Sequence, residues 1–144
     1  PGVPFEVLGT VLALPDSLPV RDATVYAYHA DASGKYGRSG ENHPHLSGTV
    51  RTDVLGRFRI RTVLPGRGGE GTPHVHFLVS TTWTQKQMHT VTLCRHLGAG
   101  SDSAYAKLPW MVDLPTDTPW AYAEPAANGG YRAKFTLYLD RRKP

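Results

Sequence analysis

The chain has 144 residues, of which 40% are hydrophobic and 19% charged, and its formal net charge is +4. This length fits one domain of ordinary size, so we expect a single domain over residues 1–144. No apolar run reaches the roughly 18 to 20 residues of a membrane-spanning helix, and the basic residues are interleaved with acidic ones. We therefore expect neither a membrane segment nor a nucleic-acid partner.

Short strands are predicted along the chain, because 15 glycines and 12 prolines leave little room for long helices. Six segments are rich in β-branched and aromatic residues and have the length of a strand. They are Val7–Leu14, Ala23–His29, Arg57–Val63, Val75–Ser80, His89–Leu93 and Tyr131–Asp140. Such a series predicts an all-β fold in which two antiparallel sheets pack as a β-sandwich with little helix.

Alternation predicts which residues of these strands face the core. In the last segment Tyr131, Phe135 and Leu139 share one face, and polar side chains occupy the other. In Arg57–Val63 the arginines alternate with apolar residues, which indicates a solvated face rather than a nucleic-acid-binding stripe.

Three longer stretches are predicted to be loops: Asp31–Thr49, Pro65–Pro73 and Gly98–Asn128. Long loops in a compact domain often carry function.

One cysteine, Cys94, is present, so no intrachain disulfide can form. A reducing compartment and a cytoplasmic location are therefore expected, and a cleaved leader remains an open alternative.

The sharpest local signal for chemistry is the pair His74 and His76, separated by one residue at the start of a predicted strand. Both imidazoles should project from the same face, where they could chelate one metal ion. Solvated or hydrogen-bonded strand histidines are the alternative. His43 and His45 lie in a polar predicted loop, where a ligand role and a plain surface role are both open.

Six short fragments in a fixed order resemble the intradiol ring-cleavage dioxygenase family, which includes the catechol and protocatechuate dioxygenases. The fragments are Gly9–Val11, Pro19–Val25, Asp31–Tyr36, Thr52–Phe58, Thr62–Gly66 and His74–His76. The resemblance implies a β-sandwich core. It also implies a mononuclear non-haem iron site held by two tyrosines and two histidines, of which Tyr36, His74 and His76 are matched here.

The second tyrosine ligand of that family is missing. It follows the proline-glycine turn as P-G-x-Y, and this chain has Pro65-Gly66-Arg67-Gly68 in that place. The family's arginine before the histidine pair is also absent, although Arg67 or Arg57 could take its part, and the glutamine on the following strand is not evident.

Several residues could compensate for the missing tyrosine. His43, His45 and His89 are candidates for a replacement ligand or a general base, with Tyr122 ranked below them. A site with more histidines would suit copper as well as iron, so iron is the first expectation and copper the alternative. Trp110, Trp120 and Tyr122 are candidates for an apolar wall around an aromatic substrate, or else core residues.

The resemblance therefore implies a metal-dependent oxidoreductase, expected as a homo-oligomer, that uses O₂ to oxidise or cleave a catechol-like substrate at an atypical Tyr/His/His site. Two alternatives lack catalysis. One is a homologous scaffold subunit that has lost the full metal site, which the missing side chains favour. The other is a ligand-binding sandwich without metal.

Overall fold

A computed structural model describes residues 3–31, 46–66, 73–95, 112–113, 120–127 and 129–140. Within these ranges the chain forms strands and contains no helix. The strands are β1 (Pro4–Leu14), β2 (Leu18–Pro19), β3 (Thr24–His29), β4 (Leu46–Arg51), β5 (Arg57–Val63), β6 (His74–Thr81), β7 (Thr84–Arg95), β8 (Val112–Asp113), β9 (Trp120–Tyr122), β10 (Glu124–Pro125) and β11 (Tyr131–Asp140). The described residues include no helix long and apolar enough to cross a membrane.

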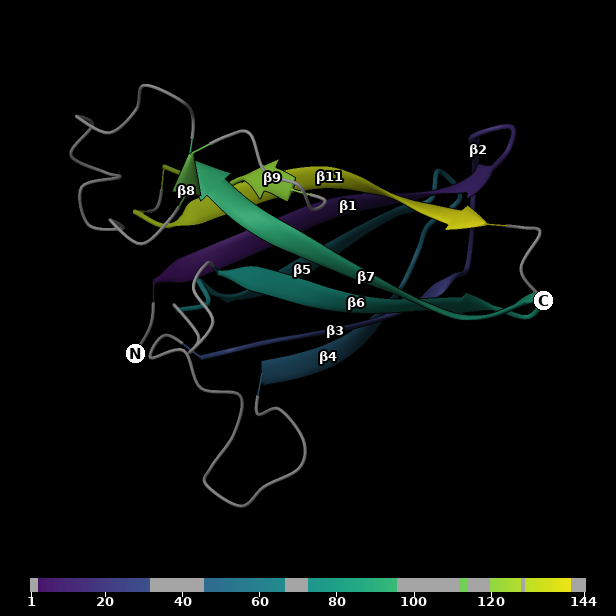
Figure 1. The fold of residues 1–144 in the computed structure, drawn as a ribbon, viewed down its shortest axis with the longest axis horizontal. Helices are drawn as coiled ribbons and strands as arrows, with labels where there is room; N and C mark the ends of the chain where they lie inside the picture. The colour runs from purple at the N-terminus through teal and green to yellow at the C-terminus, as the bar shows by residue number, and fades with distance from the viewer. Residues whose placement is uncertain are drawn as a thin grey trace, which may run out of the picture.

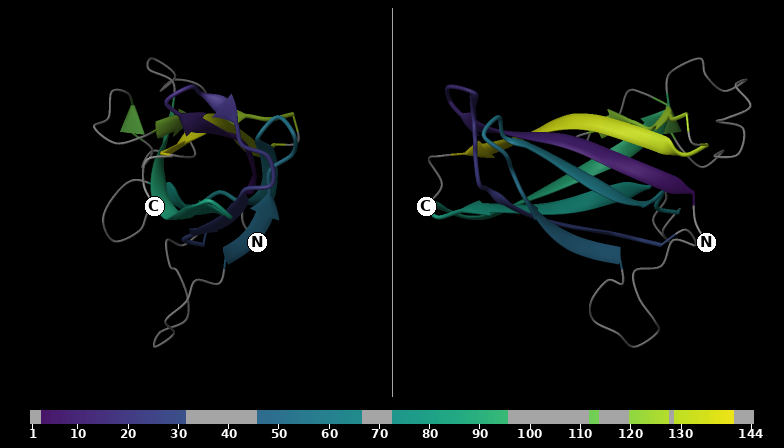
Figure 2. Two further views of the ribbon diagram at one scale, coloured as in Figure 1. Left: turned by 90° about the vertical axis from the view of Figure 1, so that its right-hand side faces the viewer. Right: turned by 180° about the vertical axis from the view of Figure 1, so that it is seen from behind.

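The strands form two sheets that lie face to face (Figure 1). One sheet has the order β10-β11-β1-β2, with β5 also paired to β1. The other has the order β4-β3-β6-β7-β8, with β9 also paired to β7. Seen along the strands, the sheets curve around a common core (Figure 2). The predicted all-β sandwich is confirmed.

The strand pairing is mostly antiparallel, but β11 runs parallel to β1, and β8 and β9 run parallel to β7. The last described strand thus lies beside the first. Both sheets are mixed, which the alternation within single segments could not reveal.

Side chains that alternate along the strands build the core between the sheets. In β11, Tyr131, Ala133, Leu137 and Leu139 are buried and Phe135 is half-buried, as the sequence pattern predicts. The three arginines of β5 are exposed, as predicted, while Phe58 between them is buried.

Two of the predicted loops contain strands. The stretch Asp31–Thr49 ends in the first part of β4, and Gly98–Asn128 contains β8, β9 and β10. These short strands have few β-branched residues. They form because they pair with β3, β7 and β11, which is a tertiary effect that local composition does not report.

The hairpin fragment Thr52–Phe58 has a structural purpose. Buried Thr52 donates its hydroxyl to the carbonyl of Val20 at 2.6 Å and accepts the amide of Ala23 at 2.8 Å. The Asp53 carboxylate accepts the amides of Leu55 and Arg57 at 2.9 and 2.8 Å, which closes the turn. This part of the resemblance therefore reports the fold and not the chemistry.

Gly9 has a similar role in packing. A Cβ atom at Gly9 would lie 2.1 Å from the ring of Phe58, its partner across the β1–β5 pair. The absence of a side chain lets this ring lie over the strand and reach Phe77 of the other sheet, 6.0 Å away between centroids. Gly9 thus helps the two sheets to pack.

Candidate metal centre

His74 and His76 project side by side from β6. Because successive side chains of a strand point to opposite faces, both point away from the core, while Val75 and Phe77 are buried in it. The two imidazole centroids lie 4.7 Å apart, with the rings edge to face at 83°. Two nitrogen donors arranged in this way can bind one metal ion from the same side.

The ring of His76 is held by residues from both neighbouring strands. Tyr28 of β3 and Thr90 of β7 are its partners in the strand register. The Tyr28 ring stacks on the imidazole at 4.7 Å and 20°, and Nδ1 of His76 lies 3.0 Å from the Thr90 hydroxyl. When Nδ1–H donates to Thr90, Nε2 carries the lone pair that a metal needs, so we expect Nε2 to be the ligand atom.

Burial lowers the pKa of His76, and the charge of the neighbouring His74 lowers it further. His76 is therefore neutral near pH 7, which is the form that binds metal ions.

Trp120 and Tyr122 lie on the outward side of β9. Ala121 between them pairs with Leu93, and both are buried, so the two aromatic residues share the opposite face with Thr92. Thr92 is also the register partner of His74. The two rings, 5.2 Å apart, line a hollow of about 300 Å³ between β9 and β11, and neither histidine is among its described lining residues.

His89 does not join the pair of histidines. It is the register partner of Phe77, so its side chain lies on the inner face of the sheet, opposite the face of His74 and His76. The predictions for Tyr36, His43, His45, Arg67 and Trp110 concern residues outside the described ranges.

The described ranges contain no group of three or more histidine, cysteine or acidic side chains that could hold a metal ion. To hold a metal ion, the histidine pair would need a further donor of another kind or from outside the described ranges. A phenolate such as that predicted for Tyr36 would meet this need.

Tyr28 and Thr90 are site residues that were not predicted. Alternation in Tyr26-Ala27-Tyr28 and in His89-Thr90-Val91 places both on outward faces, and this was visible in the sequence. That both strands flank β6 follows only from the sheet order.

His29, by contrast, is a structural histidine and is only 4% exposed. Its Nδ1–H donates to the Ala30 carbonyl at 2.6 Å, so Nε2 accepts from the Thr62 hydroxyl at 2.9 Å. This second contact joins β3 to β5, which belong to different sheets. Both contacts fit the neutral ring, and burial lowers the pKa of His29 more than the Ala30 carbonyl raises it.

We expect acid to destabilise the fold through His29. Because its pKa in the folded state is below the ordinary value of 6.5, the unfolded chain binds the proton more readily, and the free energy of unfolding falls as the pH falls below 6.5. Guanidinium unfolding at several pH values measures this. His29→Gln should show a smaller pH dependence, whereas Thr62→Val, which keeps the imidazole, should retain it. Equal slopes in all three proteins would contradict the assignment.

No family model matches the chain. The chain does match curated proteins. It is 30% identical to catechol 1,2-dioxygenase 1 of Acinetobacter lwoffii over 105 residues, which cover 58% of this chain and 33% of that protein. It is 28% identical to catechol 1,2-dioxygenase 2 of the same organism over 132 residues, covering 78% and 48%. The chain is related to the intradiol dioxygenases. It spans about a third to a half of the length of these relatives.

Solved structures of dioxygenases share the fold of this chain. An intradiol ring-cleavage dioxygenase from Tetranychus urticae superposes with a TM-score of 0.73 at 16% identity, over 98% of this chain and 82% of that one. The dioxygenase domain of a carbohydrate-binding fusion protein from Streptomyces sp. SirexAA-E gives a TM-score of 0.71 at 21% identity, over 97% and 81%. The curated relatives and the shared fold together confirm the predicted resemblance to the intradiol family.

Proposed function

We propose that this intradiol relative is a mononuclear non-haem iron dioxygenase, or part of one, that uses O₂ to oxidise or cleave a catechol-like aromatic substrate. The observation that carries the proposal is the histidine pair on β6, with the His76 ring held between Tyr28 and Thr90. Relatives of the chain are named catechol 1,2-dioxygenases, which gives the pair its chemical context.

The donor atoms suit iron. We propose that His74, His76 and Tyr36 bind it, and that copper is the alternative metal, because imidazole and phenolate oxygen serve both ions. Bound iron would supply the redox chemistry that allows a chelated catechol to react with O₂. With three protein ligands, positions remain for both hydroxyl oxygens of the substrate.

The protein residues would orient the ligands and move protons. Thr90 and Tyr28 fix the plane of the His76 ring, which sets the direction of its Nε2. A catechol must lose protons when it chelates a metal, and the family's second tyrosine, its usual acceptor, is missing here. Because His89 faces the interior, we propose His43 or His45 as the base, with Arg67 near the substrate.

We further propose that Trp110, Trp120 and Tyr122 supply an aromatic wall for the substrate. A homo-oligomeric state and a cytoplasmic location remain predictions, which size-exclusion chromatography with light scattering and cell fractionation would test.

The first experiment is elemental analysis with a visible spectrum. The untagged protein should contain close to one iron per chain and show a broad visible band from tyrosinate-to-iron charge transfer. Tyr36→Phe should lose the band and His74→Ala the iron. Tyr138→Phe, which alters an exposed tyrosine on the other sheet, should change neither.

If the protein bound metal but showed no charge-transfer band, Tyr36 would not be a phenolate ligand. If neither iron nor copper were bound after purification or reconstitution, the dioxygenase proposal would fail. The missing tyrosine, arginine and glutamine would then favour a non-catalytic scaffold subunit or a binding module.

A further inference from the structure

The outer face of the five-stranded sheet carries a cluster of exposed cations. Arg57, Arg59 and Arg61 point outward from β5, and Arg132 and Lys134 point outward from β11, because each alternates with side chains that point inward. Strand β1 runs between β5 and β11. The cluster belongs to the sheet that does not contain β6, the strand of His74 and His76.

Strand register arranges the outward side chains of β11, β1 and β5 in three rows across this face. The rows are Arg132-Glu6-Arg61, Lys134-Leu8-Arg59 and Thr136-Thr10-Arg57. In the middle row an apolar side chain, instead of a carboxylate, separates the two cations.

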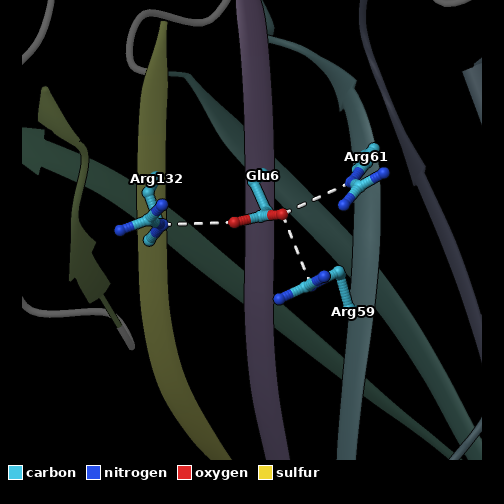
Figure 3. Close-up of polar contacts among 4 residues, drawn as sticks. All are labelled: Glu6, Arg59, Arg61 and Arg132. Carbon is cyan, nitrogen blue, oxygen red and sulfur yellow. Dashed lines mark hydrogen bonds and ion pairs between the residues drawn. The ribbon is translucent and has the colours of Figure 1, made fainter. Parts of the chain in front are cut away.

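In the first row, Glu6 offsets part of the positive charge (Figure 3). Glu6 contacts Nε of Arg132 at 3.2 Å, of Arg59 at 3.4 Å and of Arg61 at 3.5 Å. Partial burial would raise the pKa of Glu6, but the hydrogen bond from Arg132 and the other guanidinium groups outweigh it and lower that pKa. Glu6 therefore stays ionised and draws Arg59 towards the first row.

The cluster as a whole retains positive charge. Asp53 pairs with Arg57 at 3.5 Å, and Glu124 of β10 is the register partner of Arg132. Five cations thus face three carboxylates when Glu6 is included. Within the described part of the chain, no carboxylate forms an ion pair with Lys134.

The same face is hollowed. An open groove of about 720 Å³ runs over the second and third rows, and its lining includes Leu8, Thr10, Arg57, Arg59, Lys134 and Thr136. The carboxylate of Asp53, which pairs with Arg57, also lines this groove. Its volume lies in the range of small-molecule sites, which combine an apolar floor with a few polar groups. Cations on either side of Leu8, with two hydroxyl groups beside them, meet this description.

We propose that this groove binds a small organic dicarboxylate. One carboxylate would pair with Lys134 and the other with Arg57 and Arg59, and the hydrocarbon middle would lie over Leu8. The backbones of β11 and β5 are separated by two strand spacings, about 9 to 10 Å. Long cationic side chains shorten this span to the length of a short aliphatic or aromatic diacid. The site does not depend on the proposed metal centre.

Edge protection and nucleic-acid binding fit the cluster less well. Charges on an edge strand protect it from aggregation, but that role requires neither Leu8 nor Lys134. Single-stranded nucleic acid needs exposed aromatic rings for base stacking. Among the described lining residues the aromatic ones, Phe58 and Phe135, belong to or pack against the core.

Calorimetric titration with adipate tests the proposal, with hexanoate and sulfate as comparison anions. We expect one saturable adipate site per chain, with hexanoate binding at least about tenfold more weakly because it lacks the second carboxylate. Lys134→Gln, Arg59→Gln and Leu8→Ala should each weaken adipate binding, the first two by about tenfold. Arg51→Gln, which alters an exposed guanidinium on β4, and His74→Ala should leave it unchanged.

The proposal is overturned if adipate does not saturate a site on the wild-type protein. It is also overturned if Arg51→Gln weakens binding as much as Arg59→Gln, or if sulfate displaces adipate at equal concentration. Those outcomes would mean general attraction of anions to a basic protein. Loss of binding in His74→Ala would place the diacid at the metal centre instead.

Discussion

His76→Ala is expected to abolish stoichiometric iron binding, and Thr90→Val is expected to weaken iron binding by about 10- to 100-fold. The first change removes a proposed ligand. The second keeps the shape of the side chain but removes the hydroxyl that lies 3.0 Å from Nδ1 of His76. Without this partner the imidazole loses both its fixed tautomer and part of its fixed orientation. Competition with a chelator of known affinity measures the change.

Two variants separate ligand orientation from general damage. Thr90→Ser keeps a hydroxyl and should bind iron much as the wild type does. Thr10→Val removes an outward threonine hydroxyl on the other sheet and should have no effect. If Thr90→Val bound iron as tightly as Thr90→Ser, the hydroxyl would not orient His76, and coordination through Nδ1 would become the better assignment. Thermal melts would establish that every variant is folded.

Among the described site residues, those that lie on a single strand could be predicted from the sequence. The spacing of His74 and His76 is enough to place them on one face, whichever strands surround them. Tyr28 and Thr90 depend on register between strands that are far apart in sequence. The same alternation places His89 with Val91 and Leu93, two core residues, so its inward direction could have been predicted.

In the fold, too, single strands could be predicted from the sequence, but their pairing could not. The six predicted segments all form strands, as expected from runs of strand length that are rich in β-branched and aromatic residues. The parallel pairing of β1 with β11 joins the first and last described strands, and no local pattern specifies such a long-range contact. Strand β7 extends well before His89, through Gln85, Lys86 and Gln87, whose polar side chains give no strand signal.

A side-chain interaction that composition does not predict joins two strands of different sheets. The Gln87 side chain donates to the Asp140 carbonyl and accepts the Asp140 amide, both at 3.1 Å. This pair of hydrogen bonds joins β7 to β11 across the two sheets. It could not be predicted, because a glutamine that binds a distant backbone leaves no periodic pattern in the sequence.

The largest effect on stability is expected from Gly56→Ala, which should lower the free energy of unfolding by about 3 kcal/mol or more. Gly56 has φ +75, where an alanine costs about 1 to 2 kcal/mol. Its Cβ would also lie 2.5 Å from the carbonyl oxygen of Val11, which is backbone and cannot rotate away. Relief of this clash would stretch the hydrogen bond from the Val11 amide to the Gly56 carbonyl, which measures 2.7 Å.

Two other glycines separate these contributions. Gly129 has φ +84, but a Cβ added there would meet no atom within 4 Å, so Gly129→Ala should show only the conformational cost. Gly48 has neither feature and should tolerate alanine with little change. Guanidinium unfolding of the three variants should therefore give a graded series. If Gly56→Ala cost no more than Gly129→Ala, β1 would be able to move away from the hairpin, and Gly56 would matter for its backbone angle alone. A larger loss of stability for Gly56→Ala than for Gly129→Ala would show that contact with β1 fixes the turn at Gly56. The glycine that this fragment shares with the intradiol family would then be required for packing.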